Sequence, residues 1–320
     1  MIHLFVRTPG ISDQISRHPV LVFVLIRLSQ LAACCLFVAL PALAGDSLRF
    51  KLVRDYVIVN QVYVNGVGPF DFMLDTGSTG SLIELKLMKQ LQLEPAGLSL
   101  VTGLAGSRQL PYVRVDRLAV GSKVVEKLEL LSGEIKELRG LGSNIRGVLG
   151  LNFLSRFNYL LDYRHRRLEF EEGDEMSRQL TGSRLPIERI EGRVFVQARS
   201  PLQVTPTSEA TLRLMLDSGI THLMLYEKAA NRLQISVESS EWVSSLTFTG
   251  SRQTRRGLLE RLRIGTETLF DVPMGSLQGR AADEAVSADG LLPTSLFLAV
   301  YFNHKQDFVI LNPRRPKPEQ

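Results

Sequence analysis

One short pattern occurs twice in this chain, and each copy follows a run of apolar residues. The first copy is Asp75-Thr76-Gly77 after Phe72-Met73-Leu74, and the second is Asp217-Ser218-Gly219 after Leu214-Met215-Leu216. Short apolar runs of this kind predict buried strands. A carboxylate at the end of such a strand costs free energy unless it is paired or hydrogen-bonded. The two aspartates are therefore candidates for a shared acid–base site.

The similarity between the two copies extends well beyond the tripeptide. The residues that recur 142 positions later are Met73, Leu74, Asp75, Gly77, Thr79, Leu91 and Gln92. Farther along, Gly106-Ser107-Arg108-Gln109 recurs as Gly250-Ser251-Arg252-Gln253. Self-similarity over such distances indicates an internal repeat. Because there are only two copies, the sequence predicts two similar lobes related by a pseudo-twofold axis, and not a solenoid.

From about residue 48 onward, short apolar runs alternate with turn signals, which is typical of a mainly β protein with a few short helices. With 320 residues, 44% of them hydrophobic, the chain can bury a full-sized core, and its length fits two lobes. We predict helices at residues 84–91 and 226–233. We expect an N-terminal lobe at residues 45–175, a C-terminal lobe at 176–312 and a basic, Pro-rich tail at 313–320.

The first 44 residues differ in composition from the rest of the chain. An apolar stretch at residues 20–44 ends in small residues, as in a secretory signal that is cleaved after Ala44. If it stays uncut, the stretch is long enough to anchor the protein in a membrane, although Arg27 inside it is costly. Cys34, after Leu31-Ala32-Ala33, also resembles the lipidation site of bacterial lipoproteins. All three possibilities predict an exported protein, and cleavage after Ala44 predicts a periplasmic one.

The distribution of cysteine, histidine and charge limits the other functional classes. Both cysteines, Cys34 and Cys35, lie in this first segment, so the body has no disulfide framework and no thiolate metal site. The histidines after residue 44 are scattered and lack zinc-ligand spacing. A net charge of +5 is too small and too spread to indicate nucleic acid. We therefore expect no metal, no cofactor and no nucleic-acid partner, with membrane contact only through the N-terminal segment.

The residues around the two aspartates resemble the retropepsin-like aspartic proteases. The resemblance rests on Asp75-Thr76-Gly77-Ser78 after an apolar pair, on the Gly-rich segment at residues 102–106, and on Val148-Leu149-Gly150. It implies a single-chain aspartic endopeptidase, a monomer acting as a pseudo-dimer, with Asp75 and Asp217 as its catalytic pair. Thr76 and Ser218 would brace the two loops, and Gly77 and Gly219 would allow the tight turns.

The same resemblance implies two mobile hairpins, or flaps, that close over an extended polypeptide substrate. The flap residues expected to contact the substrate are Thr102, Gly103, Leu104, Ala105, Gly106, Thr249 and Gly250. Two carboxyl groups in contact share one proton, so one can activate a water while the other donates a hydrogen bond to the scissile carbonyl. No metal and no covalent intermediate is required.

Two positions depart from the family pattern. Ile220 stands where the first copy has Ser78, whose hydroxyl we expect to stabilise charge on Asp75, so we predict that the shared proton resides mainly on Asp217. Pro293 replaces the glycine expected in the second lobe. These departures leave an alternative open, an inactive pseudoprotease that binds extended peptide or a protein partner in the same cleft. A weaker third possibility is a cell-wall or carbohydrate ligand.

Overall fold

The computed structural model describes residues 47–104, 106–142, 144–202, 205, 207–235, 242–247, 250–277 and 288–314. The expected signal or anchor at residues 1–44, the flap residues Ala105 and Thr249, and residues 315–320 of the expected tail lie outside the described residues. Within the described part, no helix has the length and apolar character needed to cross a membrane.

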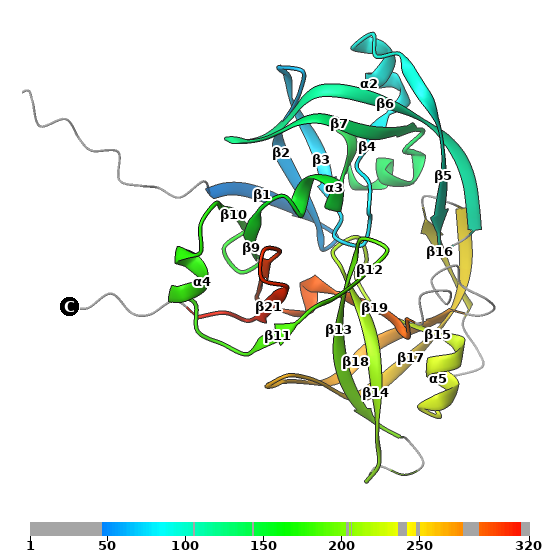
Figure 1. Ribbon diagram of the computed structural model, residues 1–320. Helices are drawn as coiled ribbons and strands as arrows, with labels where there is room; N and C mark the ends of the chain where they lie inside the picture. The colour runs from blue at the N-terminus through cyan, green and yellow to red at the C-terminus, as the bar shows by residue number, and fades with distance from the viewer. Residues whose placement is uncertain are drawn as a thin grey trace, which may run out of the picture. The chain divides into compact units, whose positions relative to one another are not determined.

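Strands make up most of the first half of the body (Figure 1). Its strands are β1 (Ser47–Val53), β2 (Tyr56–Val64), β3 (Val67–Leu74), β4 (Leu82–Glu84), β5 (Pro95–Gly103), β6 (Gly106–Val120), β7 (Lys123–Gly133), β8 (Ile145–Leu149), β9 (Asn158–Asp162) and β10 (Arg167–Glu171). Its helices are short: α2 (Leu85–Gln90), η1 (Lys136–Leu141), α3 (Leu151–Leu154) and α4 (Glu175–Gln179). The expected lobe boundary at residue 175 falls on the first residue of α4, and this boundary stays a prediction.

The second half repeats this order of elements. Its strands are β11 (Arg184–Pro186), β12 (Glu188–Ile190), β13 (Arg193–Pro201), β14 (Glu209–Asp217), β15 (Leu223–Tyr226), β16 (Trp242–Thr247), β17 (Gly250–Ile264), β18 (Glu267–Leu277), β19 (Gly290–Pro293), β20 (Ala299–Asn303) and β21 (Phe308–Leu311). Its helices are α5 (Glu227–Arg232) and η3 (Thr294–Leu296). The predicted mainly β fold with two similar halves is confirmed, and α2 and α5 occupy the two predicted helical segments.

The strands that carry the aspartates have the same neighbours in both halves. β3 pairs antiparallel with β2 and parallel with β8, and β14 pairs antiparallel with β13 and parallel with β19. Residues of these strands alternate between two apolar clusters, as the pleat of a strand requires. Phe72 and Leu74 enter the main core, whereas Met73 enters a smaller cluster on the opposite face. Met215 does the same in the second half.

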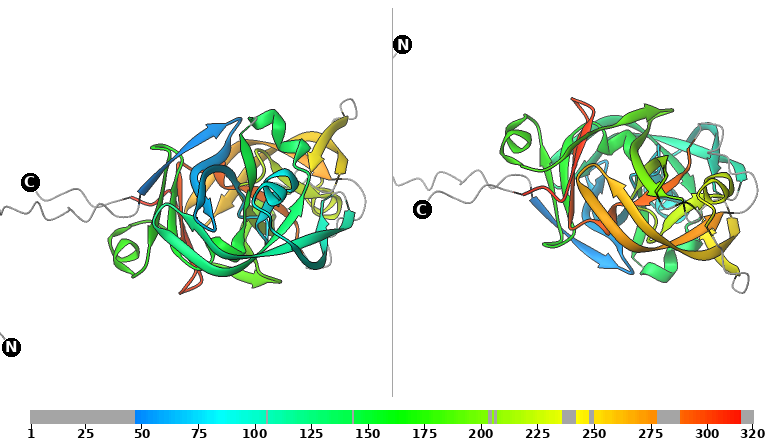
Figure 2. Two further views of the ribbon diagram at one scale, coloured as in Figure 1. Left: turned by 90° about the horizontal axis from the view of Figure 1, so that it is seen from above. Right: turned by 90° about the horizontal axis from the view of Figure 1, so that it is seen from below.

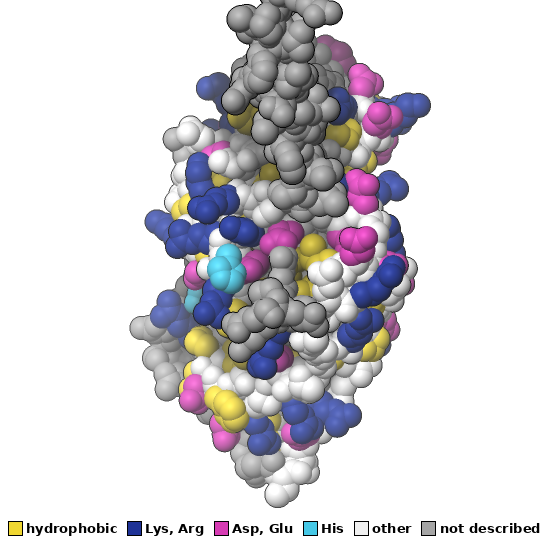
Figure 3. Space-filling view, turned by 90° about the vertical axis from the view of Figure 1, so that its left-hand side faces the viewer, with side chains coloured by type: hydrophobic (Ala, Val, Ile, Leu, Met, Phe, Trp, Pro, Cys, Tyr) yellow, Lys and Arg dark blue, Asp and Glu magenta, His cyan; other side chains and the backbone are white. Residues whose placement is uncertain are grey.

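The two halves share one sheet. In it β9 of the first half pairs antiparallel with β20 of the second, with Leu161 opposite Val300. Figure 2 shows the green β9–β10 and red β20–β21 strands together at one side of the body. Figure 3 looks onto this side, where Lys and Arg side chains are interspersed with Asp and Glu. The shared sheet therefore joins one half to the other through a second connection, in addition to the turns that carry the aspartates.

Candidate active site

Each aspartate lies at the carboxyl end of a buried strand and is held by its own turn. The N–H of Asp75 donates to the carbonyl of Leu149 at 3.0 Å, and Asp217 lies opposite Pro293 in the β14–β19 ladder. The N–H of Gly77 donates to Asp75 Oδ1 at 2.9 Å, and the N–H of Gly219 donates to Asp217 Oδ1 at 2.7 Å. Both carboxyl groups are thus oriented by equivalent backbone donors.

Thr76 and Ser218 join the two turns through reciprocal hydrogen bonds. The N–H of Thr76 donates to Ser218 Oγ, and the N–H of Ser218 donates to Thr76 Oγ1, each at 3.0 Å. Thr76 Oγ1 also donates to the carbonyl of Leu216 at 3.0 Å, and Ser218 Oγ donates to that of Leu74 at 2.9 Å. Both side chains are buried, so these four bonds are shielded from water.

The bracing brings the two carboxyl groups together. A Cβ atom placed on Gly77 would lie 2.4 Å from Asp217 Cγ, and one placed on Gly219 would lie 2.7 Å from Asp75 Cγ. The Asp217 side chain also acts on the pKa of Asp75. Two carboxyl groups this close cannot both ionise cheaply, so such a pair favours sharing one proton. The structure therefore places the two predicted aspartates side by side.

The surroundings of Asp75 favour its protonated form. Desolvation of the carboxyl group raises the pKa of Asp75, and smaller opposing contributions come from the N–H of Gly77, the Asp217 side chain and the N–H of Ser78. The Ser78 hydroxyl donates to the carbonyl of Gly80 at 2.8 Å and not to Asp75. The expectation that the Ser78 hydroxyl stabilises charge on Asp75 is therefore wrong, and the position of the shared proton within the pair stays a prediction.

Ile220 and the first flap meet on the second half. The flap is the β5–β6 hairpin, in which Thr102 pairs with Ser107 and Gly103 pairs with Gly106. Leu104 at its tip packs against the apolar cluster that contains Met215 and Met224, and Ile220 packs against the same cluster. The first flap thus reaches from one half to the other. The second flap is the β16–β17 hairpin, closed by the Thr247–Gly250 pair, and lies on the same side of the body (Figures 1 and 2).

Pro293 fits the second half because a bonding partner has changed with it. In the first half, the N–H of Gly150 donates to Ser81 Oγ at 2.9 Å. The position equivalent to Ser81 is Leu223, which offers no side-chain acceptor. Proline lacks an N–H, so its presence beside Leu223 leaves no donor unpaired there.

Tyr56, at the start of β2, was not predicted as a site residue. The Thr221 side chain of the second half lies close enough to lower the pKa of its hydroxyl. Burial raises the pKa of Tyr56, and so do the charges of Asp217 and Asp75, so the phenol lies within electrostatic reach of both carboxyl groups. Its only sequence signal is its place two residues before Ile58, on a strand that pairs with β3. Within the described ranges, no three His, Cys, Asp or Glu residues are grouped as metal ligands.

Comparison with known proteins identifies the family. The family model described as aspartyl protease matches residues 60–153 and 202–296, which together make up more than half of the chain. No curated protein matches the chain. A crystal structure of a retropepsin-like aspartic protease from Rickettsia conorii aligns over 39% of this chain and 87% of its own, with 19% sequence identity and a TM-score of 0.29. On the strength of the two family-model matches, the chain belongs to the aspartyl protease family and contains the family's domain twice.

Proposed function

We propose that this protein is an aspartic endopeptidase that hydrolyses peptide bonds with a water activated by Asp75 and Asp217. The observation that carries the proposal is the reciprocal bracing by Thr76 and Ser218, which holds the two carboxyl groups close together at the junction of the two halves. Buried acid pairs of this kind are costly to maintain and are typical of acid–base catalysis.

The proposed reaction uses both protonation states of the pair. The ionised carboxylate accepts a proton from a water, whose oxygen attacks the scissile carbonyl carbon. The protonated carboxyl group donates a hydrogen bond to the carbonyl oxygen, where negative charge develops. The tetrahedral intermediate then collapses, the C–N bond breaks, and the amine nitrogen leaves with a proton from the pair. The carboxyl groups return to a state with one shared proton.

The proposed substrate is a polypeptide in extended conformation. The first flap has glycines at both ends of its tip and reaches from one half to the other, as a closing hairpin requires. Apolar clusters lie on the faces of β3 and β14 that carry Met73 and Met215. We propose that they form the walls against which apolar substrate side chains bind.

Cleavage of a denatured protein mixture tests the proposal. The wild type should cleave it, a statine-type inhibitor should block cleavage, and the Asp75→Asn and Asp217→Asn variants should each lose activity. Asp116→Asn, at an exposed aspartate on β6, is the matched control and should remain active. Cleavage that survives in both Asn variants of the pair would rule out this mechanism. Peptide binding without cleavage by the wild type would support the pseudoprotease alternative.

We also propose that the protein is exported and works in the periplasm after cleavage behind Ala44. The apolar stretch at residues 20–44 and its small terminal residues support this proposal. Mass measurement of the first residue of the exported protein tests it, with Gly45 expected. An intact N-terminus or a lipidated Cys34 would instead support one of the two anchored forms.

A further inference from the structure

The turns that follow the two aspartates differ at one position beside the carboxyl pair. Gly77 and Gly219 each lie so close to the carboxyl group of the opposite half that no side chain fits there. The next residue along the chain is Ser78 in the first half and Ile220 in the second. Positions 78 and 220 are therefore the nearest equivalent positions after each glycine at which the two halves present side chains of different size.

Ser78 and Ile220 have different surroundings. The Ser78 hydroxyl donates to the carbonyl of Gly80 at 2.8 Å, so this short side chain is turned back onto its own loop. Ile220 is partly buried and packs against the apolar cluster that contains Met215 and Met224. The second half therefore carries an aliphatic side chain where the first half has a hydroxyl group bonded to its own backbone.

The apolar clusters beside the two turns are equivalent in position. Met73 pairs with Val148 in the first half, and Met215 pairs with Leu291 in the second. Each of these pairs belongs to the smaller cluster of its own half. Ile220 thus adds to the second cluster an aliphatic side chain that the serine at the equivalent position does not supply to the first.

The first flap contacts the same cluster as Ile220. Leu104 packs against it from the flap tip, and Ile190 packs against it from the β12–β13 hairpin. Like Ile220, both side chains are only partly buried. Ile220 therefore lies on the partly exposed edge of the second-half cluster, which is also the place that the flap tip reaches.

We propose that Ile220 is a specificity-determining residue, which restricts the substrate side chain bound against the second-half cluster to small residues such as Gly, Ala and Ser. The first-half cluster, with Ser78 at the equivalent position, accepts a larger apolar side chain such as Leu. Because the pseudo-twofold axis relates the two clusters, these two substrate side chains lie on opposite sides of the scissile bond. The inference deepens the proposed function and rests on it for the position of that bond.

The difference between the two side chains is large enough to produce such a preference. One methylene group in an apolar binding site changes kcat/KM about 10- to 200-fold, and isoleucine exceeds serine by more than one such group. A leucine placed against a surface already covered by Ile220 and Leu104 would also overpack it, which is destabilising.

The cleavage preference of the wild type is the first part of the test. A peptide library is digested, and the cleavage sites are identified by mass spectrometry. We expect small residues to be enriched at one position near the scissile bond, and larger apolar residues to be accepted at the position that the twofold axis relates to it. Equal acceptance of large residues at both positions would contradict the inference.

Reciprocal exchange of the two residues is the second part. Ile220→Ser should raise kcat/KM at least about tenfold for peptides with Leu at the restricted position, and Ile220→Ala should do the same because volume and not the hydroxyl decides. Ser78→Ile should lower kcat/KM about tenfold for peptides with Leu at the related position. Leu298→Ser, at an exposed leucine between η3 and β20, is the control and should change neither preference.

A binding measurement separates this inference from the proposed function. Peptides of one apolar sequence, varied between Ala and Leu at each position in turn, are titrated against the Asp75→Asn protein by fluorescence anisotropy. Adding Ile220→Ser should tighten binding about tenfold for peptides with Leu at one position, and adding Ser78→Ile should weaken it for peptides with Leu at another. This result with a wild type that cleaves nothing would leave the inference standing and reject the proposed function.

Two results would overturn the inference. Folded variants that cleave with the wild-type preferences would reject it and leave the proposed function standing. A protein that neither cleaves nor binds any of these peptides would reject both, because the cluster beside Ile220 would then not face a peptide.

Discussion

Gly77 and Gly219 leave no room for a side chain. A Cβ atom added to either glycine would lie closer to the carboxyl group of the opposite half than real side-chain carbons approach. The tight turn in each half therefore has a second role, which is to leave space for the acid of the other half. This explains why glycine recurs at 77 and 219 while the neighbouring hydroxyl residue varies between Thr and Ser.

Gly77→Ala tests this constraint. The new Cβ would lie 2.4 Å from Asp217 Cγ, so the carboxyl group must move. A displacement of about 1 Å can reduce a rate about 100-fold, and we expect a loss of kcat/KM of at least that order. Gly173→Ala, at a glycine with no atom within 4 Å of an added Cβ, is the control and should keep full activity. A fully active Gly77→Ala enzyme would show that the carboxyl pair does not need this geometry.

At the scale of elements, the repeat in the sequence predicted the local structure well. The 142-residue offset located both turns, and the helical pattern located α2 and α5. Hydrogen-bond partners were harder to predict. The Ser78 hydroxyl bonds to the carbonyl of Gly80, and the fit of Pro293 depends on a neighbouring residue that differs between the two copies. Tyr56 was missed because its surroundings include Thr221 and Asp217 of the second half. Such contacts depend on the relative placement of distant strands, which a local pattern does not contain.

The two braced turns should behave as one element in unfolding experiments. Thr76→Val removes the acceptor of the Ser218 N–H and the donor to the Leu216 carbonyl, leaving two buried polar groups unpaired. Each such group costs about 1–3 kcal/mol, so we expect the free energy of unfolding to fall by about 2–6 kcal/mol. Urea denaturation measures this loss.

The brace also predicts strong coupling between its two members. Ser218→Ala should cost a similar amount, and the double variant should cost clearly less than the two losses together, because both act on one hydrogen-bonded unit. Thr102→Val, at an exposed flap threonine whose hydroxyl contacts Ser107, should change stability by less than about 0.5 kcal/mol. Additive losses at positions 76 and 218 would contradict a common brace.

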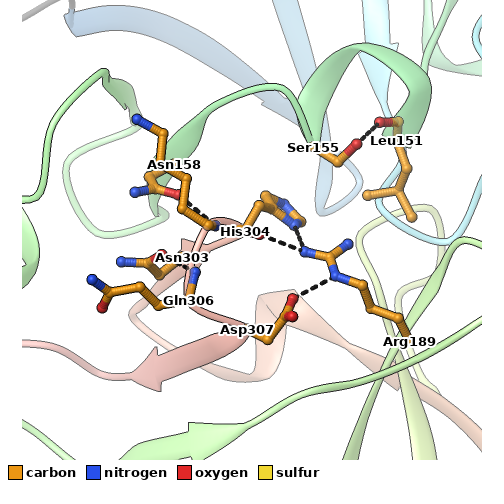
Figure 4. A network of polar contacts seen from close by, with 9 residues as sticks. Leu151, Ser155, Asn158, Arg189, Asn303, His304, Gln306 and Asp307 are labelled. Carbon is orange, nitrogen blue, oxygen red and sulfur yellow. Dashed lines mark hydrogen bonds and ion pairs between the residues drawn. The ribbon is translucent and has the colours of Figure 1, made fainter.

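At the scale of the whole molecule, the shared sheet joins the halves by pairing β9 with β20, and the turn between β20 and β21 lies beside this junction. Arg189 of β12 donates from Nη2 to the carbonyl of His304 at 3.0 Å and from Nε to Asp307 Oδ1 at 2.5 Å (Figure 4). The His304 ring stacks on Phe302 and lies beside Tyr159 of the first half. A proton on this imidazole would add charge next to Arg189 in a buried aromatic environment.

The stability of the protein should therefore fall in acid because of His304. Burial and the charge of Arg189 lower the pKa of His304 to about 3, while Asp307 opposes them. The unfolded chain takes up this proton below a pH of about 6.5, so the folded state loses stability from there down to about pH 3. The slope contributed by this one group approaches about 1.4 kcal/mol per pH unit. This contribution to acid sensitivity arises at the sheet and not at the carboxyl pair.

His304→Asn should reduce the loss of stability at acidic pH, because the amide stays neutral at every pH and can still accept a hydrogen bond from Arg189. Urea denaturation at a series of pH values between 7 and 4 measures the free energy of unfolding of variant and wild type, and their difference isolates His304 from the carboxyl groups, including Asp75. The variant should be less stable than wild type at neutral pH, where the histidine packs well, and should lose this disadvantage as the pH falls. His165→Asn, at the exposed histidine of the β9–β10 turn, is the control. Parallel curves of unfolding free energy against pH for His304→Asn and wild type would mean that the buried imidazole does not cause the loss of stability in acid.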